Sequence, residues 1–188
     1  HKSLKRYGFS GNRIAVVAPE QKLLRATLEV PAKVTGSSVD QIVRLELARL
    51  HNVAPDSFEM AYWEMKATAN PRPLTPTLAV GCPHEAANTL LDVFEDAGFR
   101  PAALDVRSAA VTRACGPRLA PPPQITALVD LGWRSTTVLF VCGRSLVYER
   151  SVQGAPMGEL TARLTEAFAL PPASAYQIVG TIGPGTEE

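Results

Sequence analysis

One short segment of the chain carries residue types that could bind a phosphate. Residues 128–137 place Asp130 and Gly132 at the end of an apolar run, and two hydroxyl groups follow at Ser135 and Thr136. A hairpin of this kind can point backbone N–H groups and hydroxyls at a phosphate, while its carboxylate holds Mg²⁺ through water. Asp and Gly are also common in turns for conformational reasons alone. The segment therefore predicts either a phosphate-binding hairpin or an ordinary tight turn.

Other catalytic chemistry finds little support. The Gly-Ser pairs at residues 36–38 and 143–145 lack the form of a nucleophile elbow, so no catalytic serine is predicted. Cys82, Cys115 and Cys142 lie far apart without C-x-x-C spacing, which argues against a zinc site and favours free thiols in a reducing cytoplasm. His51 and His84 have no cysteine–carboxylate cluster beside them. We predict no catalytic residue and no metal site.

Composition narrows the classes of partner. The chain has 188 residues, of which 46% are hydrophobic, as is typical of a globular protein. Its 19 Lys and Arg against 18 Asp and Glu leave a formal charge of +1, without the basic excess that nucleic-acid binding usually needs. No apolar run approaches the ~20 residues of a membrane-spanning helix. We expect neither a nucleic-acid partner nor direct membrane insertion.

The periodicity of apolar residues predicts a mixed α/β protein in two units. Strands are expected at residues 13–18, 24–30, 58–66, 77–82, 104–106, 125–131, 136–142 and 145–150, and helices at 38–51, 85–97, 108–114 and around 160–168. Val39, Ile42, Val43 and Leu50 recur at helical spacing in the first helix. Leu90, Leu91 and Phe94 of the second helix should face Val39, Ile42 and Val43 across or beside the sheet of the same subdomain. Ser38 and Gln41 have the spacing of a capping box. Proline-rich stretches predict an exposed connection at 69–76 and a linker at 117–123, and residues 180–188 are expected to form a loop.

The order of several segments resembles one protein family. These segments are residues 13–19, 28–31, 97–101, 104–106, 127–141 and 143–150. Together they resemble the PilM family, the actin-like proteins of type IV pilus assembly, which are related to the cell-division protein FtsA. The resemblance runs from about residue 8 to residue 180.

The resemblance implies an α/β fold that is part of the actin/Hsp70-like, ribonuclease-H-like architecture. Residues 1–116 would be the end of the first half, with an inserted SHS2-type (1C) β-α-β-β-α subdomain at about 23–99. Residues 117–123 would be the proline-rich linker, and residues 124–188 the truncated start of the second half. Asp130, Gly132, Ser135 and Thr136 would fall on the family's second phosphate loop.

A complete nucleotide site in this superfold needs parts that we do not find. The first phosphate loop would lie upstream of residue 1, and the adenosine-binding segment beyond Glu188. Trp133 and Arg134 also stand where a nucleotide-binding hairpin usually has small residues. We therefore expect no enzyme, at most a vestigial ATPase site, and no cofactor in this fragment or degenerate relative, with ATP and Mg²⁺ left to the full-length parent.

The resemblance also implies a function and a partner. It predicts a cytoplasmic scaffold at the inner face of the bacterial inner membrane, which binds the N-terminal cytoplasmic tail of a PilN-like membrane protein. That tail would dock where the inserted subdomain meets the first half, and we place its rim at Leu23, Arg25, Phe99 and Arg100. Self-association could cover the same groove. The alternatives are an ATP-dependent sugar-kinase-like enzyme or phosphatase of this superfold, and the cytoplasmic domain of a GspL-type secretion protein.

Overall fold

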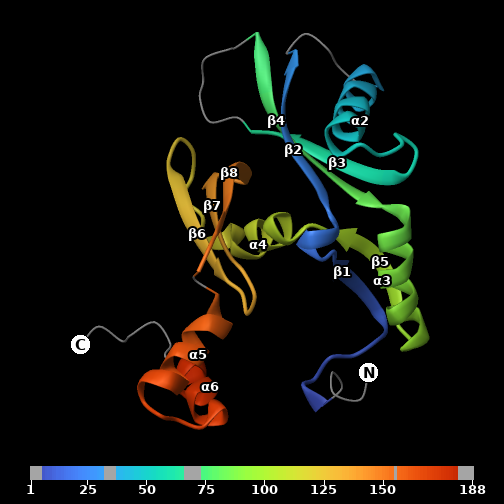
Figure 1. Ribbon diagram of the computed structural model, residues 1–188. Helices are drawn as coiled ribbons and strands as arrows, with labels where there is room; N and C mark the ends of the chain where they lie inside the picture. Colours follow the sequence, from blue (N-terminus) through green and yellow to red (C-terminus); the bar gives the residue numbers. More distant parts are fainter. Residues whose placement is uncertain (1–5, 32–36, 66–72, 155, 182–188) are drawn as a thin grey trace. The chain divides into compact units, whose positions relative to one another are not determined.

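The computed structural model describes residues 6–31, 37–65, 73–154 and 156–181 (Figure 1). It is a mixed α/β structure that divides into two compact units, residues 1–118 and 119–188. Each unit is described by itself below.

Unit 1 begins and closes on a pair of parallel strands. β1 (Arg13–Val17) pairs with β5 (Arg100–Asp105), and the register ends with Val17 opposite Asp105. The N–H of Ala18 extends the ladder by donating to the carbonyl oxygen of Asp105 at 3.0 Å. Because parallel strands cannot be joined by a tight turn, the residues between them must form a crossover. Here that crossover is large enough to hold a sheet of its own.

The crossover has the expected order of strand, helix, strand, strand and helix. After the short 3₁₀ turn η1 (Glu20–Lys22), the elements are β2 (Leu24–Pro31), α2 (Ser37–His51), β3 (Phe58–Glu64), β4 (Leu74–Pro83) and α3 (His84–Asp96). The strands form an antiparallel sheet in the order β2-β4-β3. Its central strand is the last to arrive in the chain, so β4 completes both ladders at once.

The proline-rich connection is shorter than the sequence predicted. β4 already begins at Leu74, and Pro76 lies within it, opposite Glu29 of β2. The carbonyl oxygen of Pro76 accepts a hydrogen bond from the N–H of Met65 at 2.8 Å. A proline can be accommodated here because it lies near the start of the strand, where the neighbouring ladder is only beginning. Residues 69–72 of the predicted connection lie outside the described residues.

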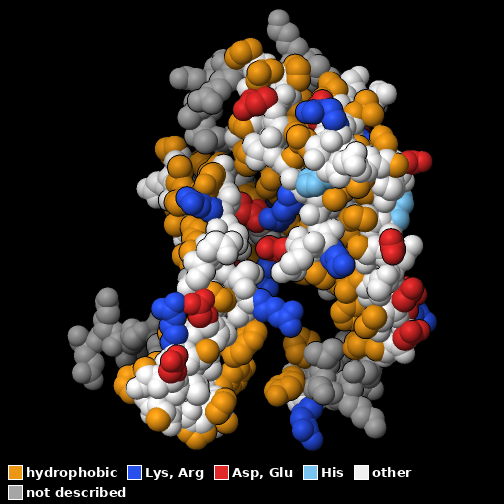
Figure 2. All heavy atoms as spheres, viewed as in Figure 1, with side chains coloured by type: hydrophobic (Ala, Val, Ile, Leu, Met, Phe, Trp, Pro, Cys, Tyr) orange, Lys and Arg blue, Asp and Glu red, His pale blue; other side chains and the backbone are white. Residues whose placement is uncertain are grey.

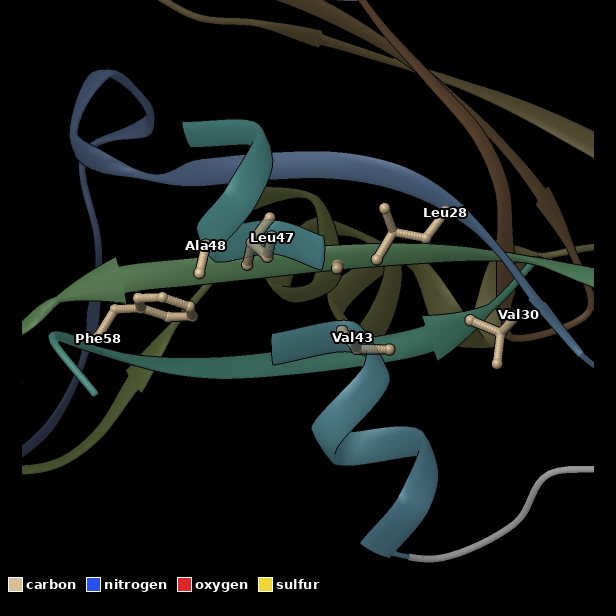
Figure 3. Close-up of a cluster of buried hydrophobic side chains, with 7 residues drawn as sticks. Leu28, Val30, Val43, Leu47, Ala48 and Phe58 are labelled. Atoms are coloured by element: carbon tan, nitrogen blue, oxygen red, sulfur yellow. The ribbon is translucent and has the colours of Figure 1, made fainter. Parts of the chain in front are cut away.

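One face of this sheet is the core of unit 1. Val43 and Leu47 of α2 and Phe58 of β3 are all fully buried, and Leu28 and Val30 of β2 complete the cluster with Ala48 and Ala79 (Figure 3). The alternation of β2 therefore places its apolar side chains as predicted. Leu50, in contrast, is 51% exposed, because α2 turns its buried face through Leu47 and Ala48 instead. The helix also begins at Ser37, one residue before the predicted cap at Ser38.

Gly81 lets the core close tightly against the central strand. A Cβ atom at this position would lie 2.8 Å from Cδ2 of Phe58 and 3.0 Å from Cδ2 of Leu47. Both distances are below ordinary van der Waals contact, so the two side chains occupy the space that a larger residue would need. Arg44 covers the outer side of Phe58, with its guanidinium 5.4 Å from the ring centre. It also donates to the carbonyl oxygen of Phe58 at 2.8 Å.

α3 packs more loosely than predicted. In the part of the chain that the structure describes, none of its residues is fully buried, and it contacts β4 and β5. Its predicted apolar face, with Leu90, Leu91 and Phe94, is half-buried and belongs to no core cluster with α2. Acidic side chains gather over this helix at the right of Figure 2. α2 packs on β2 and β4, whereas α3 contacts β4 and β5, so the two predicted apolar sets do not form one core cluster.

α3 ends in a Schellman motif. Gly98 has φ +83°, its N–H donates to the carbonyl oxygen of Glu95 at 2.8 Å, and the N–H of Phe99 donates to that of Phe94 at 2.9 Å. The rings of Phe94 and Phe99 then meet edge to face, with their centres 6.4 Å apart. This is the hydrophobic contact that usually accompanies such a cap. Unit 1 ends with α4 (Arg107–Cys115) and the 3₁₀ turn η2 (Gly116–Arg118).

Unit 2 is an antiparallel meander followed by two helices. β6 (Ile125–Leu131), β7 (Thr136–Cys142) and β8 (Ser145–Val152) pair in chain order. Their bounds are those predicted, except that β8 ends at Val152 and not at residue 150. α5 (Met157–Ala167) and α6 (Pro172–Thr181) follow and pack together. Large apolar side chains on these helices and just after α5 are exposed, namely Leu160, Phe168, Tyr176 and Ile178. Hydrophobic side chains are visible over this part of the surface in Figure 2. The sequence predicted a helix at α5 but none at α6, so the start of the loop expected at residues 180–188 is corrected to the end of α6 at Thr181.

The stability of unit 1 should depend on Phe58 more than on any residue of α3. We expect Phe58→Ala to lower the free energy of unfolding by about 3–5 kcal/mol, because it empties a fully buried site. Phe94→Ala should cost less than about half as much, since that ring is only half-buried. Urea denaturation in a Trp133→Phe background, where Trp63 reports on unit 1, measures both variants. Equal losses would show that α3 belongs to the core.

Candidate functional site

The second face of the three-stranded sheet borders a cavity of about 160 Å³ within unit 1. Side chains alternate along β3, so Phe58 and Met60 contact the α2 core while Glu59 and Ala61 point to the opposite face. On β4, Cys82 stands opposite Glu59, and Val80 stands opposite Ala61. All four residues line the cavity. One pair of strands therefore supplies the core on one side and a recess on the other.

The remaining wall comes from the two points where the strands of the first sheet end. Ala18 follows β1 and Leu23 precedes β2, while Leu104, Asp105 and Val106 end β5. The parallel pairing of β1 with β5 brings these two strand ends together. The lining contains two carboxylates, those of Glu59 and Asp105, and the weakly polar thiol of Cys82. Its other side chains are apolar. The cavity is thus an apolar recess at the junction between the inserted subdomain and the first sheet.

Asp105 holds this wall in place. Its Oδ1 accepts a hydrogen bond from the N–H of Val106 at 2.7 Å, and its Oδ2 accepts one from the guanidinium of Arg113. A carboxylate at the start of α4 also interacts favourably with the dipole of that helix. Asp105 therefore fixes the turn from β5 into α4, which forms one edge of the cavity.

The four predicted rim residues do not stay together. Leu23 lines the cavity. Arg25 is anchored inside unit 1, where its Nη2 donates to Oγ of Ser108 at 3.3 Å. Phe99 is used in the cap of α3, and Arg100 pairs with Arg13 at the start of β5. At about 3.3 Å per residue, Arg100 lies roughly 16 Å from the cavity end of its strand.

Sequence reasoning missed most of the lining, although one signal was present. Placing Phe58, Met60 and Tyr62 on one side of β3 necessarily puts Glu59 and Ala61 on the other. What the sequence does not give is the partner surface, because residues 104–106 reach the cavity only through the pairing of β1 with β5.

Cys82 is a partly buried thiol in the lining of the cavity. Burial raises the pKa of its thiol above the usual range. The thiolate is the reactive form of cysteine, so the group is less nucleophilic here than in an unfolded chain.

The predicted phosphate hairpin is present in unit 2, but its carbonyl groups are engaged. The turn between β6 and β7 closes through the N–H of Gly132, which donates to the carbonyl oxygen of Ser135 at 3.0 Å. The carbonyl oxygens of Gly132 and Trp133 each accept a hydrogen bond at 3.0 Å, from the N–H groups of Met157 and Gly158. Free N–H groups at a helix N-terminus are what would attract an anion. The hairpin therefore caps α5.

Trp133 adds side-chain contacts to the hydrogen bonds between this turn and α5. Its ring centre lies 5.7 Å from that of Tyr176 on α6. A Cβ atom on Gly158 would lie 2.8 Å from the carbonyl oxygen of Trp133 and 3.2 Å from the indole ring, so only glycine fits there without a shift. Thr136 is buried, and Asp130, Gly132 and Ser135 are half-buried. The four predicted phosphate-binding residues thus lie together in and beside one turn, and this turn packs on α5 and α6 of the same unit.

The described residues contain no group of three or more His, Cys, Asp or Glu side chains that could hold a metal ion. They also contain no helix long and apolar enough to cross a membrane.

Comparison with solved structures places the fold. A structure described as a PilM–PilN type IV pilus biogenesis complex matches with a TM-score of 0.74 and 19% identity, over 95% of this chain and 53% of the matched chain. This chain therefore spans about half of its length. The cytoplasmic domain of EpsL, an inner-membrane component of the type II secretion system of Vibrio cholerae, matches at 0.49 with 13% identity, over 90% of this chain and 60% of that one. A Bacteroides thetaiotaomicron protein with an actin-like ATPase fold matches at 0.43 with 9% identity, over 89% and 61%.

Comparison of sequences identifies the family. No curated protein matches significantly. A family model for the type IV pilus assembly protein PilM, however, matches residues 1–177, which is nearly the whole chain. The matched strands and helices are those of the partial actin-like α/β fold with its inserted subdomain, as expected from the sequence. The chain belongs to the PilM family of type IV pilus assembly proteins.

Proposed function

We propose that this chain is part of a cytoplasmic scaffold at the inner face of the inner membrane, and that unit 1 binds the cytoplasmic tail of a PilN-like membrane protein. The observation that carries the proposal is the apolar cavity at the junction of the inserted subdomain and the first sheet. Membership of the PilM family and the described PilM–PilN complex of a relative support the kind of partner.

The size of the cavity suits one large side chain. A dry cavity of about 150 Å³ in another protein holds a benzene-sized group, and this one has a volume of about 160 Å³. A Leu, Ile or Phe side chain of a partner would fill it. The favourable free energy would come from burying that apolar surface, at about 25 cal/mol per Å².

The neighbouring strand can supply the main-chain contacts. In the order β2-β4-β3, the second edge of β3 pairs with no strand of the described chain. Glu59, Met60 and Ala61 on this strand also line the cavity. An extended peptide could hydrogen-bond along the edge while it inserts one side chain into the recess. This arrangement favours an extended tail over a helix.

We propose further that this chain is not an enzyme and binds no nucleotide by itself. The turn expected to hold a phosphate accepts hydrogen bonds from α5 through two of its carbonyl oxygens and packs its indole on α6. Among the described residues of both units, no observation favours the alternative of a sugar-kinase-like enzyme or phosphatase.

Filling the cavity should prevent peptide binding. We expect Ala61→Trp to weaken binding of the labelled tail at least about tenfold, because the indole would occupy the recess. Fluorescence anisotropy with the synthetic N-terminal tail of the PilN-like protein encoded beside this chain measures the change. Arg100→Glu is the matched control and should bind normally, since Arg100 lies at the far end of β5. Unchanged binding by Ala61→Trp would place the site elsewhere.

Cys82 should report on the occupancy of the cavity. Because its pKa is raised, less thiolate is present at any given pH, and the pH at which its alkylation by iodoacetamide is half-maximal should move upward relative to the unfolded chain. A bound tail should slow the reaction further. Mass spectrometry of the modified peptides distinguishes Cys82 from Cys115 and Cys142. Alkylation at the same rate with saturating tail would contradict binding in this cavity.

Nucleotide binding should be negligible. Isothermal titration of the chain with ATP and Mg²⁺ should give no dissociation constant tighter than about 10 µM, which corresponds to about −7 kcal/mol. The expected reason is that the turn around Gly132 is already bonded to Met157 and Gly158. A tighter complex that is lost on Asp130→Ala would restore the phosphate-loop interpretation.

A further inference from the structure

We infer that the cavity of unit 1 selects an extended segment in which a Lys or Arg lies two residues from the apolar side chain that fills the recess. This inference rests on the proposed function and specifies the chemistry of the partner's tail. It follows from the charges around the cavity and from the spacing of residues along β3.

The ionisable side chains of the lining are acidic. Of the ten residues that line the cavity, Glu59 and Asp105 carry carboxylates and none is a Lys or an Arg. Two cations lie near the cavity but outside its lining: Lys22 in η1 is exposed, and Arg25, opposite Val80 in the β2–β4 ladder, donates to Oγ of Ser108. A partner that buries an apolar side chain here therefore meets negative charge at the rim. Complementary charge across an interface favours a cation and disfavours an acid.

The two carboxylates differ in the hydrogen-bond and ion-pair partners that they already have within the chain. Both oxygens of Asp105 accept hydrogen bonds, one from the N–H of Val106 and one from Arg113. Glu59 is 82% exposed, and within the described chain its contact is with Nε2 of His84 at 3.4 Å. This is longer than the 2.7–2.9 Å of a strong charge-assisted hydrogen bond. Glu59 is thus the group that can accept a guanidinium or ammonium from a partner.

A third acid adds to the same wall. Glu20 lies in η1, the turn that joins the lining residues Ala18 and Leu23. Its Oε1 is inaccessible to solvent and has no hydrogen-bond partner in the part of the chain that the structure describes. A partly buried carboxylate contributes to a negative potential that solvent screens only weakly.

The spacing follows from strand geometry. Glu59 and Ala61 lie two residues apart on the same face of β3, and Ala61 lines the recess. Residues that face each other across two paired strands have Cβ atoms about 4.5–5.5 Å apart. A peptide strand beside β3 that places its apolar residue opposite Ala61 therefore places the residue two positions away opposite Glu59. A Lys or Arg at that position pairs with the carboxylate.

The experiment compares three acetylated, fluorescein-labelled forms of the N-terminal tail of the PilN-like protein encoded beside this chain. The first is the encoded sequence, and the other two have every Lys and Arg replaced by Gln or by Glu. Fluorescence anisotropy at low salt should give affinities in the order encoded, Gln form, Glu form. Each step should be about two- to fivefold, which is the range for a cross-strand charge pair. The differences should shrink at 1 M salt, where the Debye length is about 3 Å.

Variants of the protein assign the effect to Glu59. Glu59→Gln should remove most of the discrimination between the encoded tail and the Gln form, and Glu59→Lys should reverse the order. Because Glu59 is 82% exposed, neither change should move the thermal unfolding midpoint. Glu85→Gln is the matched control, since Glu85 is an exposed acid in the first turn of α3 outside the lining, and it should discriminate like the wild type.

The outcomes separate this inference from the function on which it rests. If the encoded tail does not bind the wild-type chain, the proposed function fails and the inference fails with it. If the tail binds but the three forms bind equally, the charge selection is wrong and the peptide site stands. Discrimination that survives Glu59→Gln would likewise overturn the assignment to Glu59.

Discussion

The parallel pairing of β1 with β5 is the constraint on which unit 1 depends. Strands of the same direction cannot be linked by a turn, so about eighty residues of chain must leave the sheet at Ala18 and return at Arg100. The pairing of Val17 with Asp105 then brings the exit point beside the cavity end of β5. The recess exists because an independent sheet is inserted at that point and presents its second face to the strand ends. The recess at this junction is therefore a consequence of the topology rather than of any single residue.

Unit 2 shows how a turn can keep its sequence pattern while its polar groups serve the fold. A phosphate-binding hairpin must leave N–H groups unpaired and directed at the ligand. Here Gly132 and Trp133 supply carbonyl groups to the first turn of α5, and Gly158 makes room for the indole. The backbone of this turn points its carbonyl oxygens at the N-terminus of α5. To hold an anion, the turn would have to present N–H groups to the ligand instead. The absence of small residues at positions 133 and 134 was the sequence signal for this outcome.

The strands of unit 2 and the α2 core could be predicted because period-2 and helical patterns directly express burial. The bounds Ile125–Leu131 and Thr136–Cys142 follow from such local signals. α6 was missed because Pro171 and Pro172 suggest a connection, whereas Pro172 is the first residue of the helix, where a missing N–H costs nothing. Two of the predicted rim residues, the half-buried Phe99 and the exposed Arg100, lie at or just before the start of β5, away from the cavity, because the sequence marks where the inserted subdomain ends but not which end of β5 faces it. Only the strand register shows that the junction lies at Asp105.

The alternation along β3 ties recognition to the accuracy of strand pairing. Phe58 and Glu59 are neighbours in sequence, yet one lies in the core and the other at the cavity, and Gly81 and Cys82 divide in the same way on β4. Sliding β3 by a single residue would exchange the two sets, burying a carboxylate and turning an aromatic ring into the recess. The close fit of Phe58 over Gly81 penalises that slip within the core itself. Packing in the hydrophobic core thus fixes the strand register, and the strand register determines which side chains line the cavity on the opposite face.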